Sequence, residues 1–492
     1  MKISVLSLFA AVALPVTAAD VTDATPGELA SLLGDDTASI TSLKVGGTID
    51  VRDLLTISTL PQLKDLDLSA VSIAAYTPDR PLPLSEGDFA ADYLPAGIFF
   101  GKHFTSVVLP ESLTAIGSHS LAGNDFAAIT LPEKLRSVGD YAFYDCDKLT
   151  AITLPASVAD LGAYSFAGCD ALASADLSAS SLEKIADYAF RSDNLLADLK
   201  LPARLGEVGT GAFAGCTALT AATLPSSLDY VGEQAFTHSG LTGIVVPSSV
   251  SEVGDFGFAR CDALEQATVE DGALTLGQGV FFYDKALKEV KADGIATVPA
   301  YTFAGAAALI HGENGILSDA TEVGAYAFLD NQAEKLILSP ALVSLADGAL
   351  EGMTGLKEID ATALGDRVPE LGSDVFAGIN QPEVELVVAA DTGKVWESAP
   401  QWKEFKVRQV LGVGDTVADA SSVKAWFEGR ILRISSPYEI ESVAVYLTGG
   451  AKAFHVEPYA TTASVNTSDF SDRVYVVEVV TAEGRDVFKL LR

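Results

Sequence analysis

The chain has 492 residues, more than one compact core usually holds, so its length predicts two or three domains or a repeat array. Its 66 acidic residues outnumber the 32 basic residues and give a net charge of −34 at pH 7. A surface this negative repels phosphate backbones and anionic lipid headgroups, so we expect no nucleic-acid partner and no membrane-surface binding. Hydrophobic residues make up 49% of the chain, which predicts a folded protein, and 4 cysteines are too few for a disulfide scaffold.

The N-terminus has the pattern of a secretory signal peptide. One basic residue, Lys2, precedes an apolar run over residues 3–16, and small residues then lead to Asp20. The run is shorter than the roughly 20 residues that a transmembrane helix needs, and no cysteine follows it to carry a lipid anchor. We therefore predict a signal over residues 1–19 and a secreted or cell-surface protein without membrane insertion; a buried N-terminal helix is the alternative.

A repeat organises the middle of the chain. The hexapeptides at 138–143, 161–166 and 323–328 share the form apolar-Gly-x-Tyr-small-Phe. The final aromatic residue, the landmark of the repeat, recurs every 22 to 26 residues, with leucine in two units: Phe99, Leu121, Phe143, Phe166, Phe190, Phe213, Phe236, Phe258, Phe281, Phe303, Phe328, Leu350 and Phe376. These thirteen units predict one array over residues 94–408 rather than several globular domains.

Each unit can be interpreted as one coil of a solenoid. Residues 149–154 have the apolar and small polar mixture of a short strand, and Pro155 ends it because proline has no N–H for the ladder. Gly139, four residues before its landmark, allows a tight turn, and Phe143 then enters the interior. No unit can bury its apolar side alone, so neighbouring units stack around a continuous core.

The unit Leu-Pro-x-x-Leu-x-x-Val-Gly-x-x-Ala-Phe-x-Gly-Cys-x-x-Leu resembles the leucine-rich repeat of the BspA-like family of bacterial surface proteins. The copy from Leu201 to Pro225 carries the resemblance most fully. It implies a mainly β leucine-rich repeat solenoid. It also implies a secreted or surface-displayed protein-binding or adhesion protein, often from gut or oral bacteria.

Two segments flank the array. Residues 20–93 lack the landmark and predict an N-terminal cap with one or two atypical coils, in which a helix starts at Pro26 with Thr25 as its N-cap. At the other end Trp396 and Trp402 supply apolar cover.

Residues 409–492 predict a small antiparallel β-sandwich, with strands at 431–434, 442–446, 474–480 and 487–491. The Val443–Gly450 and Val474–Val479 elements resemble the tail domains by which Bacteroidetes-type bacteria export proteins through type IX secretion. A plain accessory β-domain is the alternative.

The cysteines share one position of the repeat. Cys146, Cys169, Cys216 and Cys261 each follow their landmark by three residues, which indicates small buried side chains. A bridge between Cys146 and Cys169, in adjacent coils, is an alternative. Neither the cysteines nor the five histidines have metal-ligand spacing, and no nucleophile–base group stands out. We therefore nominate no catalytic residue, metal or cofactor and predict that the protein is not an enzyme.

Residues that could contact a ligand are expected on the coil surface. Tyrosine recurs two residues before the landmark, and the pairs ahead of the turn glycine vary in type. The candidate ligand contacts are Tyr141, Tyr164, Tyr188, Tyr301, Tyr326, Arg136, Lys184 and Tyr230. Tyrosines in a row can stack on a sugar or bind a protein, and the alternative is that they pack along the coil edge.

The predicted function is an adhesion or interaction protein that binds a host or surface macromolecule through the repeat face. The alternative is a glycan-binding or scaffolding component of a bacterial surface nutrient-acquisition system.

Overall fold

The computed structural model describes residues 17–35, 37–84, 87–270, 274–292, 295–306, 320–409, 423–428, 430–447, 452–467, 474–481 and 484–491. Residues 1–16, most of the expected signal, lie outside this part, so the signal stays a prediction. The chain divides into two compact units, one holding the solenoid up to Asp360 and the other holding the C-terminal sheet.

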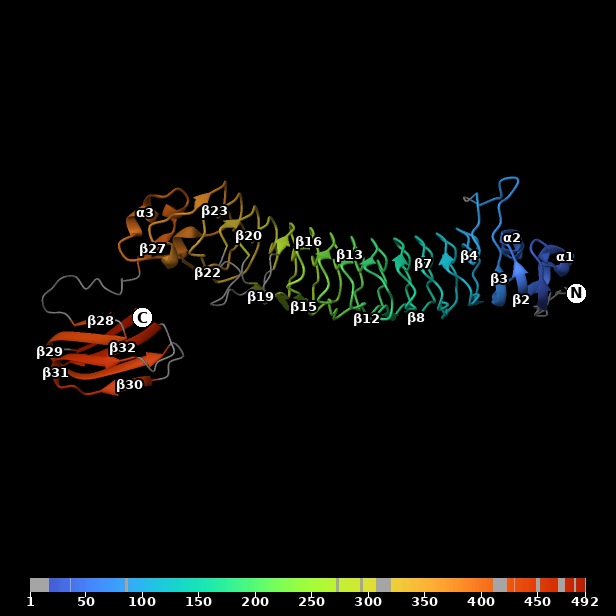
Figure 1. Cartoon of the computed structure of the whole chain (residues 1–492). Coiled ribbons are helices and arrows are strands. Elements are labelled where there is room, and N and C mark those ends of the chain that lie inside the picture. The colour runs from blue at the N-terminus through green and yellow to red at the C-terminus, as the bar shows by residue number, and fades with distance from the viewer. Residues whose placement is uncertain are drawn as a thin grey trace, which may run out of the picture. The chain divides into compact units, whose positions relative to one another are not determined.

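A first set of strands follows one side of the solenoid and comes just before the Leu-Pro pairs (Figure 1). Its sheets contain β1 (Thr17–Ala24), β2 (Ile40–Ile49), β3 (Asp65–Ile73) and β5 (Ser106–Val108); β8 (Ala151–Thr153), β10 (Ser174–Asp176) and β12 (Asp198–Lys200); β15 (Gly243–Val246), β17 (Gln266–Val269) and β19 (Glu289–Ala292); and β22 (Lys335–Ile337), β24 (Glu358–Asp360), β26 (Glu385–Val388) and β27 (Lys406–Gln409). The pairing is parallel with a register of one coil, as Ala151 opposite Ser174 shows. In β8 and β10 the middle residue is buried and its two neighbours are not, as the alternation of a strand requires.

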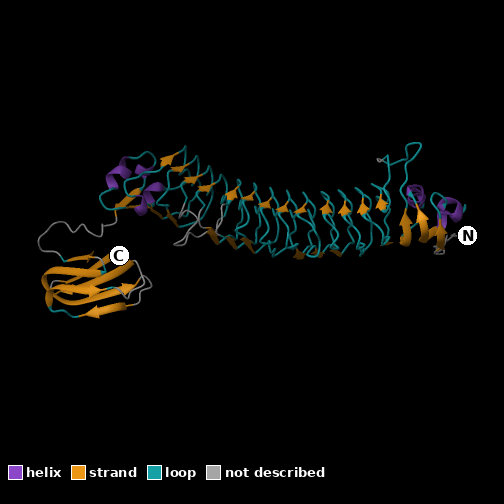
Figure 2. Ribbon diagram, viewed as in Figure 1, coloured by secondary structure: helices purple, strands orange, loops and turns teal. Residues whose placement is uncertain are grey.

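A second set of two-residue strands lies just before the turn glycines. It contains β4 (Tyr93–Leu94), β6 (Ala115–Ile116), β7 (Ser137–Val138) and β9 (Asp160–Leu161); β11 (Lys184–Ile185), β13 (Glu207–Val208), β14 (Tyr230–Val231), β16 (Glu252–Val253) and β18 (Thr275–Leu276); and β20 (Thr297–Val298), β21 (Glu322–Val323), β23 (Ser344–Leu345) and β25 (Glu370–Leu371). Figure 2 shows the two sets as two rows of short strands joined by turns. The mainly β solenoid predicted from the repeat is confirmed. It has about 16 turns, which include the thirteen predicted units and the coils of the segment before residue 94, where one or two were expected.

The landmark phenylalanines form one column in the core. Phe143, Phe166, Phe190, Phe213 and Phe236 are fully buried, and the ring centroids of successive members lie 5.0 to 5.5 Å apart. Interplanar angles along this run are 3 to 17°. Each ring therefore packs on the ring of the next coil, and no single coil completes the core by itself.

Two positions of the coil have a backbone in the left-handed region. The residue two before the landmark has φ near +55° to +60° in most coils, as at Tyr164 (54°), Tyr188 (58°) and Gly211 (55°). The residue two after the landmark is similar, with φ of 64° at Ser192 and 79° at Gly215. Glycine adopts this conformation freely, whereas a residue with a side chain is strained there.

The N-terminal coils carry two helices, α1 (Leu29–Leu33) and α2 (Val51–Thr59), and a 3₁₀ turn, η1 (Thr37–Ser39). The expected helix start at Pro26 is wrong, because α1 begins three residues later with Glu28 at its N-cap. The reason is that a side chain from outside this segment caps the start of the helix. Asp53, at the start of α2, accepts hydrogen bonds from the backbone N–H of Gly27 at 2.7 Å and of Leu29 at 2.9 Å.

The end of the array has more irregular elements, α3 (Gly393–Ser398) and the 3₁₀ turns η2 (Thr362–Leu364), η3 (Gln381–Glu383) and η4 (Trp402–Glu404). Trp396 and Trp402 are buried and pack edge to face with their ring centroids 5.2 Å apart. The indole N–H of Trp396 donates to the carbonyl of Gly365 at 3.0 Å. The two tryptophans thus pack on each other, and the prediction that they cover the end of the array stays a prediction.

The C-terminal unit contains an antiparallel sheet of β28 (Lys424–Glu428), β29 (Ile431–Leu447), β30 (Lys452–Val456), β31 (Ala460–Asn466), β32 (Val474–Thr481) and β33 (Gly484–Leu491). The strands expected at 431–434 and 442–446 are one 17-residue strand, β29. Its first half pairs with β28 and β31 and its second half with β30 and β32, with a register shift between Ser435 and Ile440. Both halves contribute to one core, with Leu432 and Ile434 from the first half and Val443 and Val445 from the second. The resemblance to type IX tail domains stays a prediction.

Candidate ligand-binding face

The predicted tyrosines form a stacked ladder over part of the solenoid. His119, Tyr141, Tyr164 and Tyr188 follow one another at ring-centroid distances of 4.6, 4.7 and 4.7 Å, with interplanar angles of 14, 4 and 20°. The rings are half-buried, because each covers the next and leaves its edge in solvent. They pack along the coil edge, as the alternative interpretation has it, and they still present a continuous aromatic surface.

His119 was not among the predicted residues. It stands two residues before Leu121, a landmark position filled by leucine, so the repeat alignment alone could have found it.

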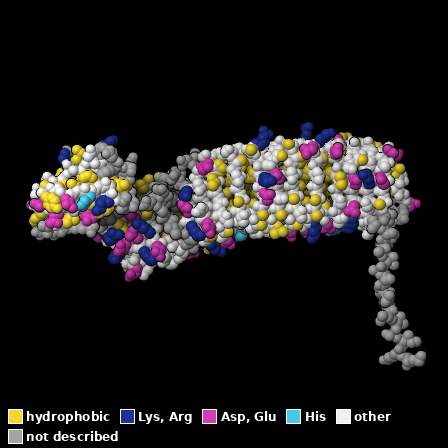
Figure 3. Space-filling model, turned by 90° about the horizontal axis from the view of Figure 1, so that it is seen from below, with side chains coloured by type: hydrophobic (Ala, Val, Ile, Leu, Met, Phe, Trp, Pro, Cys, Tyr) yellow, Lys and Arg dark blue, Asp and Glu magenta, His cyan; other side chains and the backbone are white. Residues whose placement is uncertain are grey.

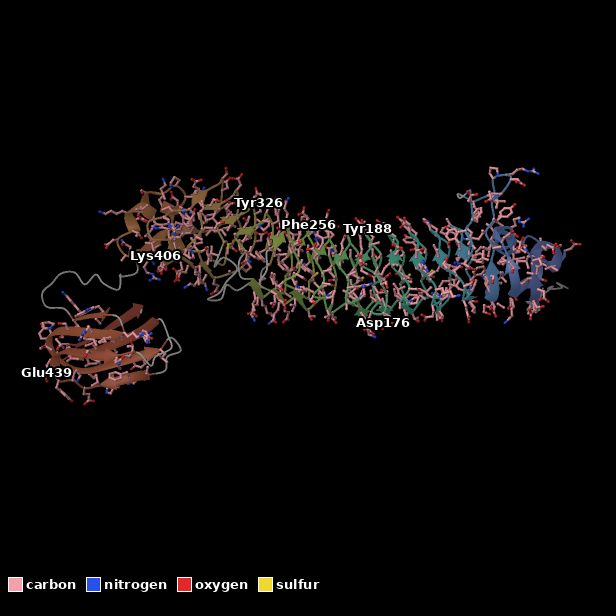
Figure 4. The ribbon with its side chains drawn as sticks, in the orientation of Figure 1. Asp176, Tyr188, Phe256, Tyr326, Lys406 and Glu439 are labelled. Carbon is pink, nitrogen blue, oxygen red and sulfur yellow. The ribbon has the colours of Figure 1, made fainter. Side chains whose placement is uncertain are left out.

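The ladder does not run from Tyr188 to Tyr301 without a break. Tyr301 and Tyr326 form a separate pair with centroids 5.3 Å apart. In the coil after Tyr188 the ladder position is Gly211, and a Cβ there would lie 2.5 Å from Cδ1 and Cε1 of Tyr188. The tyrosine ring thus lies directly over the glycine. Figure 4 shows Tyr188, Phe256 and Tyr326 along one edge of the solenoid and Asp176 along the opposite edge.

A cleft of about 560 Å³ lies where the ladder is interrupted. Its walls come from five successive coils, each of which contributes one to three of the same positions: two residues before the landmark, one after it and two after it. The lining residues are Tyr188, Arg191, Ser192, Ala214, Gly215, Gln234, Thr237, His238, Phe256, Ala259, Arg260 and Phe282. Of these residues, only Tyr188 was predicted from the sequence as a ligand contact.

The coil of Phe213 forms the floor of the cleft. At the three outward positions it has Gly211, Ala214 and Gly215, the smallest side chains that any coil has there. The coil before it presents Tyr188 and Arg191, and the coils after it present larger residues again. The cleft could have been found from the sequence by comparing the residues at all three positions from coil to coil. Recurring tyrosine at one position does not reveal it.

Two arginines on the cleft walls lie over aromatic rings. Cζ of Arg191 is 5.5 Å from the ring centroid of Tyr188, and Cζ of Arg260 is 5.9 Å from the centroids of Phe282 and Tyr283. Both distances are within the range of a cation–π contact. Both side chains are exposed, and within the described part of the chain neither arginine has a carboxylate at ion-pair distance.

The other predicted contacts lie elsewhere on the coil. Lys184 and Tyr230 belong to strands β11 and β14 of the second set, and Arg136 directly precedes β7. The Lys184 ammonium is 2.7 Å from Glu207, and this hydrogen bond raises the pKa of the lysine. Burial and the nearby carboxylates of Glu252 and Glu207 raise the pKa of Tyr230. The structure therefore does not bring these three residues into the cleft.

The first set of strands carries ion pairs between coils. Lys200 pairs with Asp176 at 3.0 Å, and Lys335 pairs with Glu358 at 2.8 Å. Figure 3 shows charged side chains of both signs next to one another along this side of the solenoid. The lysines here are matched by acids of a neighbouring coil, whereas the cleft arginines are not.

The four cysteines are free and buried, so the structure has no bridge between Cys146 and Cys169. Each thiol donates a hydrogen bond of 3.2 Å to the landmark carbonyl of the preceding coil, as from Cys169 to Phe143. Burial raises the pKa of Cys146 to about 12, and it raises the pKa of the other three thiols as well. These groups stabilise the stack and are poor nucleophiles.

No group of three or more His, Cys, Asp or Glu side chains in the described part of the chain is placed to hold a metal ion. No helix there combines the length and the apolar character needed to cross a membrane.

The repeat region matches a known family. The family described as "BspA type Leucine rich repeat region" matches in six copies over residues 92–220, 183–310 and 316–391. No curated protein matches the chain.

Solved structures are similar to this chain, and the first of those named here shares its fold. A leucine-rich repeat protein from Bacteroides ovatus is 22% identical, with 76% of this chain and 86% of that chain covered and a TM-score of 0.56. A leucine-rich repeat protein of T. pallidum is 27% identical over 36% of this chain and 78% of that chain, with a TM-score of 0.30. A leucine rich cell surface protein from Faecalibacterium prausnitzii is 17% identical over 57% and 86%, with a TM-score of 0.31. With more than half of its length matched by the repeat model, this chain belongs to the BspA type leucine-rich repeat family.

Proposed function

We propose that this protein is an exported, non-catalytic interaction protein that binds a host or surface macromolecule through the turn face of its solenoid. The turn face is the surface formed by the turns around the landmarks, where the ladder and the cleft lie. One observation carries the proposal: the stacked rings from His119 to Tyr188 end at the cleft, and Tyr188 forms part of its wall. A row of half-exposed aromatic rings next to unpaired arginines has the composition of a recognition surface.

The backbone holds this face rigidly. The Tyr188 N–H donates to the carbonyl of Thr210, and the Gly211 N–H donates to the carbonyl of Glu233, each at 2.8 Å. Such bonds link every ladder position to the following coil. A surface that is already ordered loses little conformational entropy when a partner binds, so its contacts contribute fully to affinity.

The non-catalytic part of the proposal draws on the cysteines. These four side chains would be the strongest nucleophiles of the chain, and all of them are buried with raised pKa values. Each of them has a structural role between coils instead. The family supports the same view, because leucine-rich repeat proteins generally mediate protein–protein interaction.

A second candidate function is a glycan-binding or scaffolding role in a surface nutrient-acquisition system. The stacked rings favour it, because the apolar face of a sugar packs well on an aromatic ring. The parallel stack of Tyr141 on Tyr164, with 4° between the rings, presents such a surface.

The test is capture of extracellular-matrix proteins and mucin by the pure protein, before and after enzymatic deglycosylation. We expect a variant with Tyr141→Ala and Tyr164→Ala to lose most of its binding, and Tyr230→Ala, a tyrosine off the ladder, to keep it. Binding that survives deglycosylation supports a protein partner, and binding that disappears supports the glycan role. If Tyr230→Ala abolishes binding while the ladder variant binds normally, the turn face is not the binding surface.

A further inference from the structure

We propose that the cleft between Arg191 and Arg260 binds a sugar ring that carries a carboxylate, such as a uronate or sialate unit of an acidic glycan. This inference rests on the proposed function, because it names the ligand class for the same face. The cleft volume of about 560 Å³ is within the range of roughly 300–1,000 Å³ that is usual for small-molecule sites.

The end of the ladder provides a stacking surface for a sugar. Tyr164 covers one face of the Tyr188 ring. On the following coil Gly211 has no side chain, and the next ladder residue, Gln234, lies one coil further. Because the Tyr188 ring itself lies over Gly211, a sugar ring would stack on the face of Tyr188 that is turned away from Tyr164, on the side of Gln234.

The two arginines provide the charge for a carboxylate. A guanidinium offers parallel N–H donors that match the two oxygens of a carboxylate. Arg191 lies over Tyr188 on one wall, and Arg260 lies over Phe282 on the other. Within the described residues, neither arginine forms an ion pair with a carboxylate.

The charge of the cleft is opposite to that of the whole protein. The chain has a net charge of −34, yet none of the twelve lining residues, all of them described, is acidic. In a chain with 66 acidic residues this local reversal favours an anionic ligand. Salt screens the repulsion from carboxylates that lie further than about 10 Å away at 0.1 M. Asp187, Glu233 and Asp255 are nearer, because each directly precedes a lining residue, but none of them lines the cleft.

The remaining polar residues suit hydroxyl groups. Gln234, Thr237 and His238 come from one coil and line the side opposite Tyr188. Thr237 Oγ1 donates to the carbonyl of Ala259 at 2.9 Å, which leaves its oxygen free to accept from a ligand hydroxyl.

An acidic peptide fits this cleft less well than a sugar. All twelve lining residues lie in turns, so no strand edge is present to which a peptide backbone could add. The floor of Ala214 and Gly215 also offers no deep apolar pocket for an anchoring side chain.

The experiment is isothermal titration calorimetry of the full chain with four probes. These are sialyllactose and its neutral counterpart lactose, and trigalacturonate and its methyl ester. We expect at least one acidic probe to bind and its neutral counterpart to bind at least about tenfold more weakly, because the charge-assisted hydrogen bonds are lost. Binding of sialyllactose alone identifies a sialate ligand, and binding of trigalacturonate alone identifies a uronate ligand.

The variants test the geometry. Arg191→Gln and Arg260→Gln should each weaken binding at least about tenfold, whereas Arg136→Gln, the same change outside the cleft, should not. Ala214→Phe should block the floor, and Ala167→Phe places the same ring at the same coil position outside the cleft. Phe282 and Tyr144 already occupy this position in other coils, so the fold accepts an aromatic residue there.

Three results would overturn the inference. These are binding of neither acidic sugar, equal binding of the neutral probes, or tighter binding of poly-glutamate that depends on the same arginines. If the acidic sugars fail while a macromolecule is still captured through the ladder, only this inference is lost. If the sugars bind but no macromolecule is captured, the proposed function is lost and the cleft remains a sugar site.

Discussion

The backbone N–H of Cys169 donates a hydrogen bond of 2.8 Å to Oδ1 of Asp193 in the next coil, although Asp193 is completely buried. Cys261 and Asp284 repeat the relationship at the same distance. In both aspartates the second oxygen, Oδ2, has no hydrogen-bond partner. Both occupy the position three residues after the landmark, where several other coils have a hydrogen-bond donor. There Asn124 donates Nδ2 to the carbonyl of Phe99 in the preceding coil, and the cysteines donate their thiols.

We predict that Asp193→Asn stabilises the protein at pH 7 by about 1–3 kcal/mol, the usual cost of a buried polar group without a partner. Burial raises the pKa of Asp193 well above its ordinary value of 3.8. At pH values between the ordinary pKa and the raised pKa, the native chain binds more protons than the unfolded chain. The contribution of this carboxyl to stability therefore falls as pH rises. The advantage of the asparagine variant should therefore be large at pH 7 and should shrink towards pH 4. Thermal unfolding from pH 4 to 8 measures it, with the exposed change Asp229→Asn as control, and an advantage independent of pH would contradict this explanation.

The four cysteines should react with iodoacetamide only when the chain unfolds. The thiolate is the reactive form, and burial both hides these thiols and raises their pKa, to about 12 for Cys146. Mass spectrometry after labelling at pH 8, with and without guanidinium, measures the number of modified thiols. Thr217→Cys adds an exposed thiol beside Cys216 and should react at once in the folded protein. Labelling of native thiols without unfolding, or a mass that shows a Cys146–Cys169 bridge, would count against the structure described.

The phenylalanine column should be sensitive to truncation and tolerant of leucine. Phe213→Ala removes a fully buried ring that packs between Phe190 and Phe236, and we expect a loss of about 3–5 kcal/mol. Phe213→Leu should lose clearly less, because Leu121 and Leu350 fill the same position in their own coils. Guanidinium unfolding followed by circular dichroism compares the two variants. Equal losses would show that ring stacking, rather than filled volume, holds the column together.

At the ladder position an alanine variant should be less stable than a glycine variant, which is the reverse of the usual order. Tyr164 has a φ of 54°, a conformation that costs a residue with a Cβ roughly 1–2 kcal/mol and costs glycine little. Tyr164→Ala and Tyr164→Gly both lose the stacking with Tyr141 and Tyr188, so their difference in unfolding free energy isolates the backbone term. Ala163→Gly, at the residue before, where the structure has no positive φ, should instead destabilise. A Tyr164→Gly variant less stable than Tyr164→Ala would refute this account of the coil.

The repeat made most of the solenoid predictable. Phe143 and Cys146 recur in phase with glycine and leucine, and phase-locked positions specify which residues face the core. The sequence could not reveal α1 in the same way. Its start is fixed by Asp53, more than twenty residues away, and a local capping pattern at Thr25 cannot show a tertiary hydrogen bond.

The cleft escaped prediction for a different reason. The tyrosines were found because a large residue recurs, whereas a cleft forms where large residues are missing. Gly211 and Gly215 do not stand out in a chain with 42 glycines, and a single alanine such as Ala214 does not stand out either. They become informative only when their three positions are known to lie on one surface, and the structure supplies that knowledge.

The register of the second set of strands has a consequence for how such a site can evolve. Lys184 lies opposite Glu207, Glu207 opposite Tyr230 and Tyr230 opposite Glu252, so the coils of Arg191 and Arg260 are a whole number of repeats apart. Duplication of one repeat between them would widen the cleft by one strand spacing, about 4.8 Å, and would preserve the hydrogen bonds between coils. The size of ligand that such a protein accepts is therefore inherited as a number of repeats, and recombination between similar units can change it in a single step.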